Sequence, residues 1–425
     1  MKSLFENRYR RPPVHRDGAA AAAEIARIAL RYLDAMRAVP GRPAAMEYFD
    51  GIMSGEERVA EVRAFRKGGG KVVGLFCNFV PEELVIALGA LPVRLCAGAF
   101  PAIAPAEEVL ARDICPMVKS AFGLRMMNLS YMAECDLVIV PTSCDAKKKG
   151  SRFFDQYVPT WTLDLPQAKD YDRNLALWTR EIQRLRGRLE EFTGRKLTKD
   201  GLADSIRLLH RRAEAFRRFH EARRRNPCAI NGRDTFLAIQ ATFYDDPARW
   251  TRSFDALTEE IAAVSADAET ARRPRILLTG APVIWPNWKL IHTIEEAGAV
   301  VVADTLCSGT QRLFDPVEVD EWTYDGMLRA LAVKHLFPSI CPCFIENAEH
   351  IDRVIELAEE FRVDGVIYHI LRLCQLFDME YNHVGASVRD KGTPLLGITT
   401  DYSLEDEEQL KTRVEAFLEM IEGKR

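Results

Sequence analysis

Cysteine is the residue type whose number and spacing in this chain are most able to do chemistry. The chain has 10 cysteines among 425 residues. Cys77 and Cys144 are 67 residues apart, and Cys307 and Cys374 repeat that separation. In each half one more cysteine follows the first, by 38 residues in one case and 36 in the other. The spacing therefore selects six candidate ligands of one site: Cys77, Cys115, Cys144, Cys307, Cys343 and Cys374.

Thiolates gathered from distant loops favour an iron-sulfur cluster over zinc, because structural zinc sites usually draw on close CxxC pairs and this chain has none. The competing interpretation is that each cysteine is a small buried apolar residue, as is usual for cysteine in a cytosolic protein. We favour that interpretation for Cys135 and Cys228. Cys96 follows a predicted strand and can line the site without binding metal. Cys341 competes with Cys343 for one ligand position, and the spacing within the second half favours Cys343.

Short apolar runs that end close to several of these cysteines predict buried parallel strands. The first run, residues 72–76, ends directly before Cys77, and Pro81 followed by two glutamates then starts a helix. The carboxyl ends of parallel strands are where open α/β sheets bind ligands. Alternation of strands and helices predicts two groups of strands, at residues 72–76, 93–95, 137–140, 160–163, 276–279, 300–303, 363–368 and 395–398.

The same pattern predicts how the chain divides. Residues 1–70 are expected to form helices preceded by a loosely attached arm, and residues 71–170 a first α/β domain. Residues 171–270 lack strand signals and are expected to form a helical insertion. Residues 271–425 are expected to form a second α/β domain with a closing helix. Because strand ends of two such domains can face one cleft, we expect the six candidate cysteines to meet there.

The charge balance argues against partners of strongly opposite charge. With 58 basic and 62 acidic residues the net charge is −4, which gives no overall case for binding nucleic acid or a membrane surface. No apolar run approaches the ~20 residues of a membrane span. The basic, proline-containing start does not resemble a secretory signal, so we expect a cytoplasmic protein whose cysteines are not disulfides.

Several strings of residues resemble the 2-hydroxyacyl-CoA dehydratase and benzoyl-CoA reductase family. They are CNFVPEEL from Cys77, RDIC from Arg112, PTSCDAKKK from Pro141, LCSGT from Leu306 and DYS from Asp401. The resemblance implies two Rossmann-like, flavodoxin-like parallel-sheet domains related by pseudo-duplication, with an iron-sulfur cluster between them. It also implies a separate ATP-hydrolysing iron-sulfur activator protein that supplies electrons. This chain has no Walker-type phosphate-binding loop of its own.

The number of cysteines separates two kinds of relative within that family. Members with a single 4Fe-4S cluster resemble this chain at three positions, which we place at Cys115, Cys144 and Cys374. The chain is more similar to the double-cubane cluster proteins, whose 8Fe-9S cluster joins two 4Fe-4S units through a sulfide, because it has three further cysteines, Cys77, Cys307 and Cys343. The resemblance therefore implies an oxygen-sensitive, homodimeric reductase of small molecules. The alternatives are a 2-hydroxyacyl-CoA dehydratase subunit acting on an acyl-CoA, and a metal-free two-domain ligand-binding or regulatory protein.

Two other residues are candidates for a catalytic role. His369, directly after the strand predicted at residues 363–368, can deliver protons near Cys374, or it can simply be satisfied by a backbone carbonyl. Lys147 follows Cys144 and can offset cluster charge or meet a phosphate-bearing substrate, or it can belong to a solvated charge run. Eight arginines between residues 207 and 225 fit either a solvated amphipathic helix or a docking face for an acidic partner such as the activator.

Overall fold

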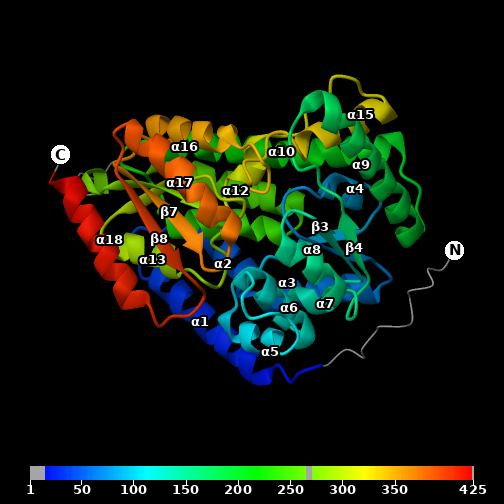
Figure 1. The fold of residues 1–425 in the computed structure, drawn as a ribbon, viewed down its shortest axis with the longest axis horizontal. Coiled ribbons are helices and arrows are strands. Elements are labelled where there is room, and N and C mark those ends of the chain that lie inside the picture. Colours follow the sequence, from blue (N-terminus) through cyan, green and yellow to red (C-terminus); the bar gives the residue numbers. More distant parts are fainter. Residues whose placement is uncertain (1–14, 265–269, 424–425) are drawn as a thin grey trace.

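Two four-stranded parallel sheets organise the computed structural model, which describes residues 15–264 and 270–423. The sheets occupy opposite ends of the molecule (Figure 1). The first has the order β2-β1-β3-β4 and consists of β1 (Val72–Leu75), β2 (Leu91–Arg94), β3 (Leu137–Pro141) and β4 (Thr160–Leu163). The second has the order β6-β5-β7-β8 and consists of β5 (Arg275–Gly280), β6 (Val300–Asp304), β7 (Gly365–Leu371) and β8 (Leu395–Thr400).

The two sheets have the same strand order when each is numbered from its own first strand. Every strand pair is parallel, so each connection must cross over, and helices supply the crossovers. The order 2-1-3-4 is the beginning of the flavodoxin-like arrangement. The predicted fold class, two Rossmann-like domains of similar architecture, is therefore confirmed.

Helices precede, cover and separate the sheets. Before and around the first sheet lie α1 (Ala19–Arg37), α2 (Met46–Ser54), α3 (Glu56–Lys67), α4 (Glu82–Ala87), η1 (Phe100–Ala102), α5 (Ile103–Glu107), α6 (Pro116–Met126), α7 (Ser130–Glu134) and α8 (Asp145–Phe154). The middle of the chain forms α9 (Tyr171–Thr193), α10 (Lys199–Arg223), α11 (Gly232–Gln240), η2 (Ala241–Phe243) and α12 (Pro247–Ala263). The second sheet is accompanied by η3 (Thr270–Arg272), α13 (Lys289–Glu296), α14 (Gln311–Phe314), α15 (Tyr324–Lys334), α16 (Ala348–Glu360), α17 (Gln375–Asp390) and α18 (Glu407–Glu422).

All eight predicted strands are present, and β7 differs most from its expected limits. It begins two residues later and ends three residues later than the range 363–368. The apolar run continues through Ile370 and Leu371, and both pair with β8. His369 therefore lies inside β7 rather than directly after it.

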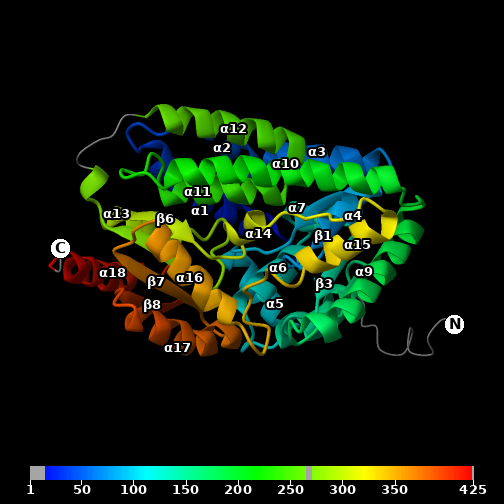
Figure 2. The ribbon, with the colours of Figure 1, turned by 90° about the horizontal axis from the view of Figure 1, so that it is seen from above.

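The long helix α10 connects the two halves. Figure 2 shows it running beside α12 across the molecule, and it also contacts α4 and α14. Its first half buries Leu202 and Ile206 in the core of the first sheet. Its second half buries Phe216 and Phe219 in the core that contains β5 and β6. Two of its arginines, including Arg212, are buried rather than solvated, which corrects the simplest view of this helix as a charged surface.

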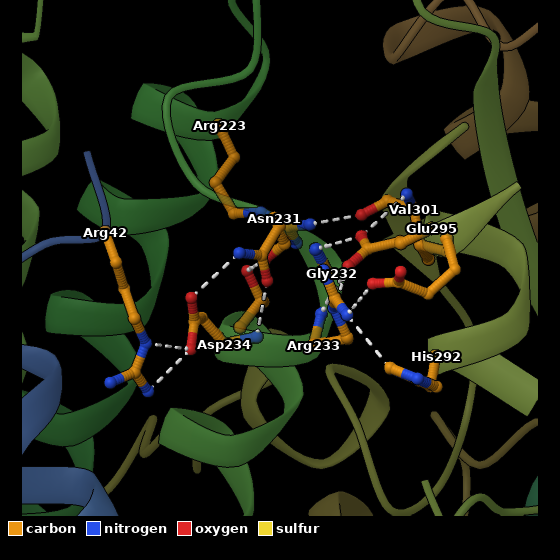
Figure 3. A network of polar contacts seen from close by, with 11 residues as sticks. Arg42, Arg223, Asn231, Gly232, Arg233, Asp234, His292, Glu295 and Val301 are labelled. Carbon is orange, nitrogen blue, oxygen red and sulfur yellow. Dashed lines mark hydrogen bonds and ion pairs between the residues drawn. The ribbon is translucent and has the colours of Figure 1, made fainter. Parts of the chain in front are cut away.

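A buried polar network fixes the start of α11 against the second half (Figure 3). Glu295 of α13 accepts hydrogen bonds from the Gly232 backbone N–H at 2.5 Å and from Arg233 Nε at 3.0 Å. On the other side Asp234 accepts from Arg42 at 2.8 Å. Both carboxylates are almost fully buried and paired, so removing either partner leaves an uncompensated charge.

Two expectations concern the chain's ends and its surroundings. The arm expected at the N-terminus falls mostly on residues 1–14, which lie outside the described residues. Within the described ranges, no helix combines the length and the hydrophobicity that crossing a bilayer requires.

Candidate functional site

Three of the six candidate cysteines lie immediately before helices, and we call them the helix-start cysteines. Cys115 precedes α6, Cys144 precedes α8 and Cys374 precedes α17. In each case the backbone N–H groups of the first helical turn lower the pKa of the thiol, although none of them makes a hydrogen bond with the sulfur. The positive end of a helix favours a thiolate over a thiol. Local structure thus prepares all three to bind a cation.

The other three candidates lie in irregular segments, and we call them the loop cysteines: Cys77, Cys307 and Cys343. Cys77 follows β1 with φ of 57°, a left-handed conformation that residues other than glycine rarely adopt. The Arg94 guanidinium donates to its carbonyl oxygen. The Cys307 carbonyl accepts from Asn78 Nδ2 at 3.2 Å. Their positions therefore depend on contacts with other parts of the chain.

Lys147 lies among the cysteines. Its Nζ donates to Cys77 Sγ at 2.8 Å, and its charge acts on the pKa of seven more thiols. Burial lowers the pKa of Lys147, but the charges of Cys77, Cys144 and Cys96 outweigh burial and hold it well above its usual range. The structure thus brings eight cysteines within electrostatic reach of one ammonium group: Cys77, Cys96, Cys115, Cys144, Cys307, Cys341, Cys343 and Cys374.

The remaining two cysteines, Cys135 and Cys228, are buried elsewhere in the core, as predicted from the sequence. Cys135 is buried beside Gly74, and its thiol donates to the Tyr131 carbonyl at 3.3 Å. Cys228 is buried and donates to the Ile230 carbonyl at 3.2 Å. Each of these two thiols is satisfied by its own neighbourhood.

Two pairs of thiols interact electrostatically. The interaction of Cys115 with Cys374 lowers the pKa of Cys374 and raises that of Cys115. The interaction of Cys343 with Cys341 lowers the pKa of Cys341 to about 7 and raises that of Cys343. Cys341 and Cys343 thus occupy adjoining positions, and the geometry leaves both available as ligands. The preference for Cys343 stays a prediction.

Tyr402 is a site residue that the spacing of cysteines did not reveal. It is 2% exposed, and its hydroxyl has no hydrogen-bond partner within the described part of the chain. Burial raises its pKa well above the usual range, and four surrounding cysteines raise it further: Cys115, Cys96, Cys374 and Cys307. A buried hydroxyl without a partner is costly, so this one is suited to donate to a group bound among the thiols. The signal available in the sequence was the string that begins at Asp401.

His369 has the environment of the second alternative, in which a backbone carbonyl satisfies the imidazole. It is 4% exposed, and its Nδ1 donates to the Ala281 carbonyl at 2.7 Å. Burial lowers its pKa to about 4, and the charge that affects this pKa is Lys289 rather than a cysteine. The imidazole is therefore neutral, and a backbone carbonyl satisfies one of its nitrogens. Its role in proton delivery stays a prediction.

The donor set can be compared with what different metal sites require. Among the described residues, no three His, Cys, Asp or Glu side chains surround a single-ion position. A cubane takes about one protein thiolate per iron, so its ligands are spread more widely than those of one zinc ion. Eight convergent thiols and the unpartnered Tyr402 hydroxyl fit a group of that size and softness.

Comparison with known proteins extends over the same region. Residues 77–421 match the family model described as 2-hydroxyglutaryl-CoA dehydratase, D-component. YjiM of Escherichia coli K12, provisionally named a dehydratase subunit, is 34% identical over 85% of this chain and 94% of its own length. The beta subunit of (R)-2-hydroxyglutaryl-CoA dehydratase from Acidaminococcus fermentans is 24% identical over 84% and 94%. A benzoyl-CoA reductase subunit from Thauera aromatica is 24% identical over 72% and 78%.

Proposed function

This chain belongs to the 2-hydroxyglutaryl-CoA dehydratase D-component family, and within it we propose that the protein is an iron-sulfur reductase. It receives low-potential electrons from a separate ATP-hydrolysing activator and passes them to a small molecule. The cofactor is a double-cubane 8Fe-9S cluster between the two parallel-sheet domains. The convergence of eight thiols around Lys147 carries this proposal, because a single cubane needs no more than about four.

Six of the eight thiols are assigned as ligands. Three thiolates for each cubane and one shared sulfide complete both units, which accounts for the three helix-start and the three loop cysteines. When bound, such a cluster supplies electrons of very low potential, because each thiolate adds negative charge in a buried place. Cys96 and Cys341 then line the site.

Two side chains of the protein adjust that site. The Lys147 ammonium offsets part of the thiolate charge and orients Cys77 through the 2.8 Å contact with its sulfur. The Tyr402 hydroxyl is positioned to donate a hydrogen bond to a sulfur atom or to a substrate. Hydrogen bonds to sulfur raise the reduction potential of a cluster, so both residues should make this potential less negative.

A second candidate function has support from the names of the relatives. The YjiM and Acidaminococcus proteins are both named as dehydratase subunits. A dehydratase subunit with one 4Fe-4S cluster needs only the helix-start cysteines and an open iron position for the acyl-CoA. It leaves the arrangement of the loop cysteines without an explanation.

Iron and acid-labile sulfide in protein purified without oxygen separate these functions. We expect about eight irons per chain, since cluster size follows the number of available thiolates. A value of about four favours the dehydratase subunit. Protein without iron or sulfide, when it is made in cells that assemble clusters, contradicts both.

A further inference from the structure

A cavity of about 50 Å³ lies between the two halves, behind the loop cysteines. Residues of α4, α10, α14 and α15 surround it, and no cysteine lines it. A thin layer separates it from the thiols: Asn78 Nδ2 donates to the Cys307 carbonyl and to Gln311 Oε1, each at 3.2 Å. The cavity is therefore distinct from the cysteine site and adjacent to it.

Basic groups outnumber acidic ones in its lining. The four cations are Arg94, Arg212, Arg312 and Lys334, and the three carboxylates are Glu82, Glu83 and Asp315. Glu82 alone faces the three arginines, at 3.1 Å in the case of Arg312. Glu83 is bonded to His335 at 2.9 Å instead. Asp315 Oδ1 also lies 3.9 Å from Nη2 of Arg353, a residue outside the cavity. Positive charge in the lining is thus incompletely balanced.

Unused hydrogen-bond donors accompany this excess charge. Among the described residues, the Lys334 ammonium makes no hydrogen bond or ion pair. The buried Nε atoms of Arg94 and Arg212 also have no partner. Burial lowers the pKa of Lys334, and it lowers that of Arg312 to about 9 in spite of Glu82. Burial is the largest cause of both shifts, and neighbouring arginines lower the two pKa values further.

The volume limits what can neutralise the cavity. A buried water needs roughly 10–15 Å³ of such space, so 50 Å³ holds a few waters or one anion of similar size. An acyl-CoA is far too large. The rim formed by Asp315, Pro316 and Lys334 is partly exposed, so a small solute has a way in.

We propose that this cavity is a binding site for a small oxyanion or short carboxylate, held by Lys334 with support from Arg212 and Arg312. The Lys334 ammonium and the Arg212 Nε atom lack partners in the described ranges and can hold such an anion through charge-assisted hydrogen bonds, while Arg312, which donates to Glu82 and Thr242, adds positive charge. The site does not depend on the proposed reductase function, since its lining contains no candidate ligand of the cluster. Asn78 lines the cavity and directly follows Cys77 in the chain, so a bound anion lies next to the segment that carries this loop cysteine.

Isothermal titration calorimetry tests this on the full chain purified without oxygen. Sulfate, nitrate and acetate are titrated separately, in a buffer whose own anion is too large for the cavity. We expect saturable binding of at least one anion with about one site per chain. Lys334→Met should weaken that binding about tenfold or more, the loss expected for a charge-assisted hydrogen bond.

Three variants control the result. Arg329→Met removes one positive charge from an exposed position of the same helix and should leave binding within about twofold, because distant exposed charges are screened. Lys334→Arg should retain binding. The iron content of Lys334→Met should equal that of the unaltered protein, which distinguishes this proposal from the reductase function. Absence of saturable binding in the unaltered chain, or equal losses in Lys334→Met and Arg329→Met, overturns the proposal whether or not every variant folds.

Discussion

The helix-start and loop cysteines contribute equal numbers of thiols to one site, but the chain positions them in different ways. Cys115, Cys144 and Cys374 take their places from the helices that follow them. Cys77 and Cys307 are held instead by side chains from other elements, such as Arg94 and Asn78. The first set is therefore determined by local structure, whereas the second depends on contacts with other elements, which for Cys307 cross between the two halves. Variants that affect one set and spare the other test this difference.

The largest effect is expected when a helix-start cysteine is removed. Cys144→Ser should lose nearly all iron, because both the double-cubane and the single-cubane arrangement use this thiolate. Iron and acid-labile sulfide per chain are the measurements. Cys135→Ser, which removes a buried thiol outside the site, is the matched control and should keep its iron. Full iron content in Cys144→Ser would exclude Cys144 as a ligand.

Removal of a loop cysteine should have about half that effect. Cys77→Ser is expected to lower iron from about eight to about four per chain, since only the second cubane depends on it. Cys343→Ser should behave in the same way, whereas Cys341→Ser should keep its iron. If Cys77→Ser keeps the iron content of the unaltered protein, Cys77 is not a ligand. The dehydratase function with a single cubane is then favoured.

The contacts that hold the loop cysteines can be weakened without touching a thiol. Burial raises the pKa of Glu82, but its arginine partners outweigh burial and hold the pKa well below the usual range. Glu82→Gln should cost about 3–5 kcal/mol in the free energy of unfolding, as expected when a buried ion cluster loses one partner. Because Arg94 is then released from Glu82, iron should also fall below the normal content.

Glu295→Gln provides the control for that variant. It removes a buried carboxylate whose hydrogen bonds go to Gly232, Arg233 and Val301 and not to Arg94 or Asn78, the residues that hold the loop cysteines. Urea unfolding should report a similar loss of stability for both variants, and iron analysis should report a loss only for Glu82→Gln. Equal iron in the two variants would contradict the dependence of the loop cysteines on this ion cluster.

The smallest effect concerns Tyr402, whose pKa is affected by cysteines of both sets. Tyr402→Phe should keep all iron, and it should shift the reduction potential to more negative values by tens of millivolts, because a hydrogen bond to the bound group is lost. A redox titration followed by electron paramagnetic resonance measures the shift. Tyr244→Phe, which changes a half-buried tyrosine whose pKa is affected by Cys96, should leave the potential in place. Equal potentials in all three proteins would remove Tyr402 from the site.

Much of this architecture could be predicted from the sequence because buried parallel strands are short apolar runs. All eight strands were identified in this way, and the repeated cysteine spacing reflects two sheets with the same strand order. The least accurate limits were those of β7, where His369 interrupts the apolar run but the strand continues. A single polar residue inside a fully buried strand looks like an end when only the sequence is available.

Features that depend on packing between the halves could not be predicted. Lys147 is one of three consecutive lysines, and only the rotation of α8 turns it toward Cys77 while Lys148 and Lys149 remain exposed. The sequence offered Cys96 as a residue that lines the site and Cys341 as a competitor of Cys343, but only the meeting of the two sheets brings both thiols within electrostatic reach of Lys147. The same applies to Tyr402, which comes from the last part of the chain.

The helix α10 has a consequence for the electron transfer that we propose. With 25 residues it is about 37 Å long, and its two halves are buried in different cores. A hinge motion of the two halves would have to pull Phe216 and Phe219 from one core or Leu202 and Ile206 from the other. The width of the site is therefore fixed before any electron arrives. Surroundings that stay in place when a charge is added have a small reorganisation energy, and such preorganisation favours rapid transfer.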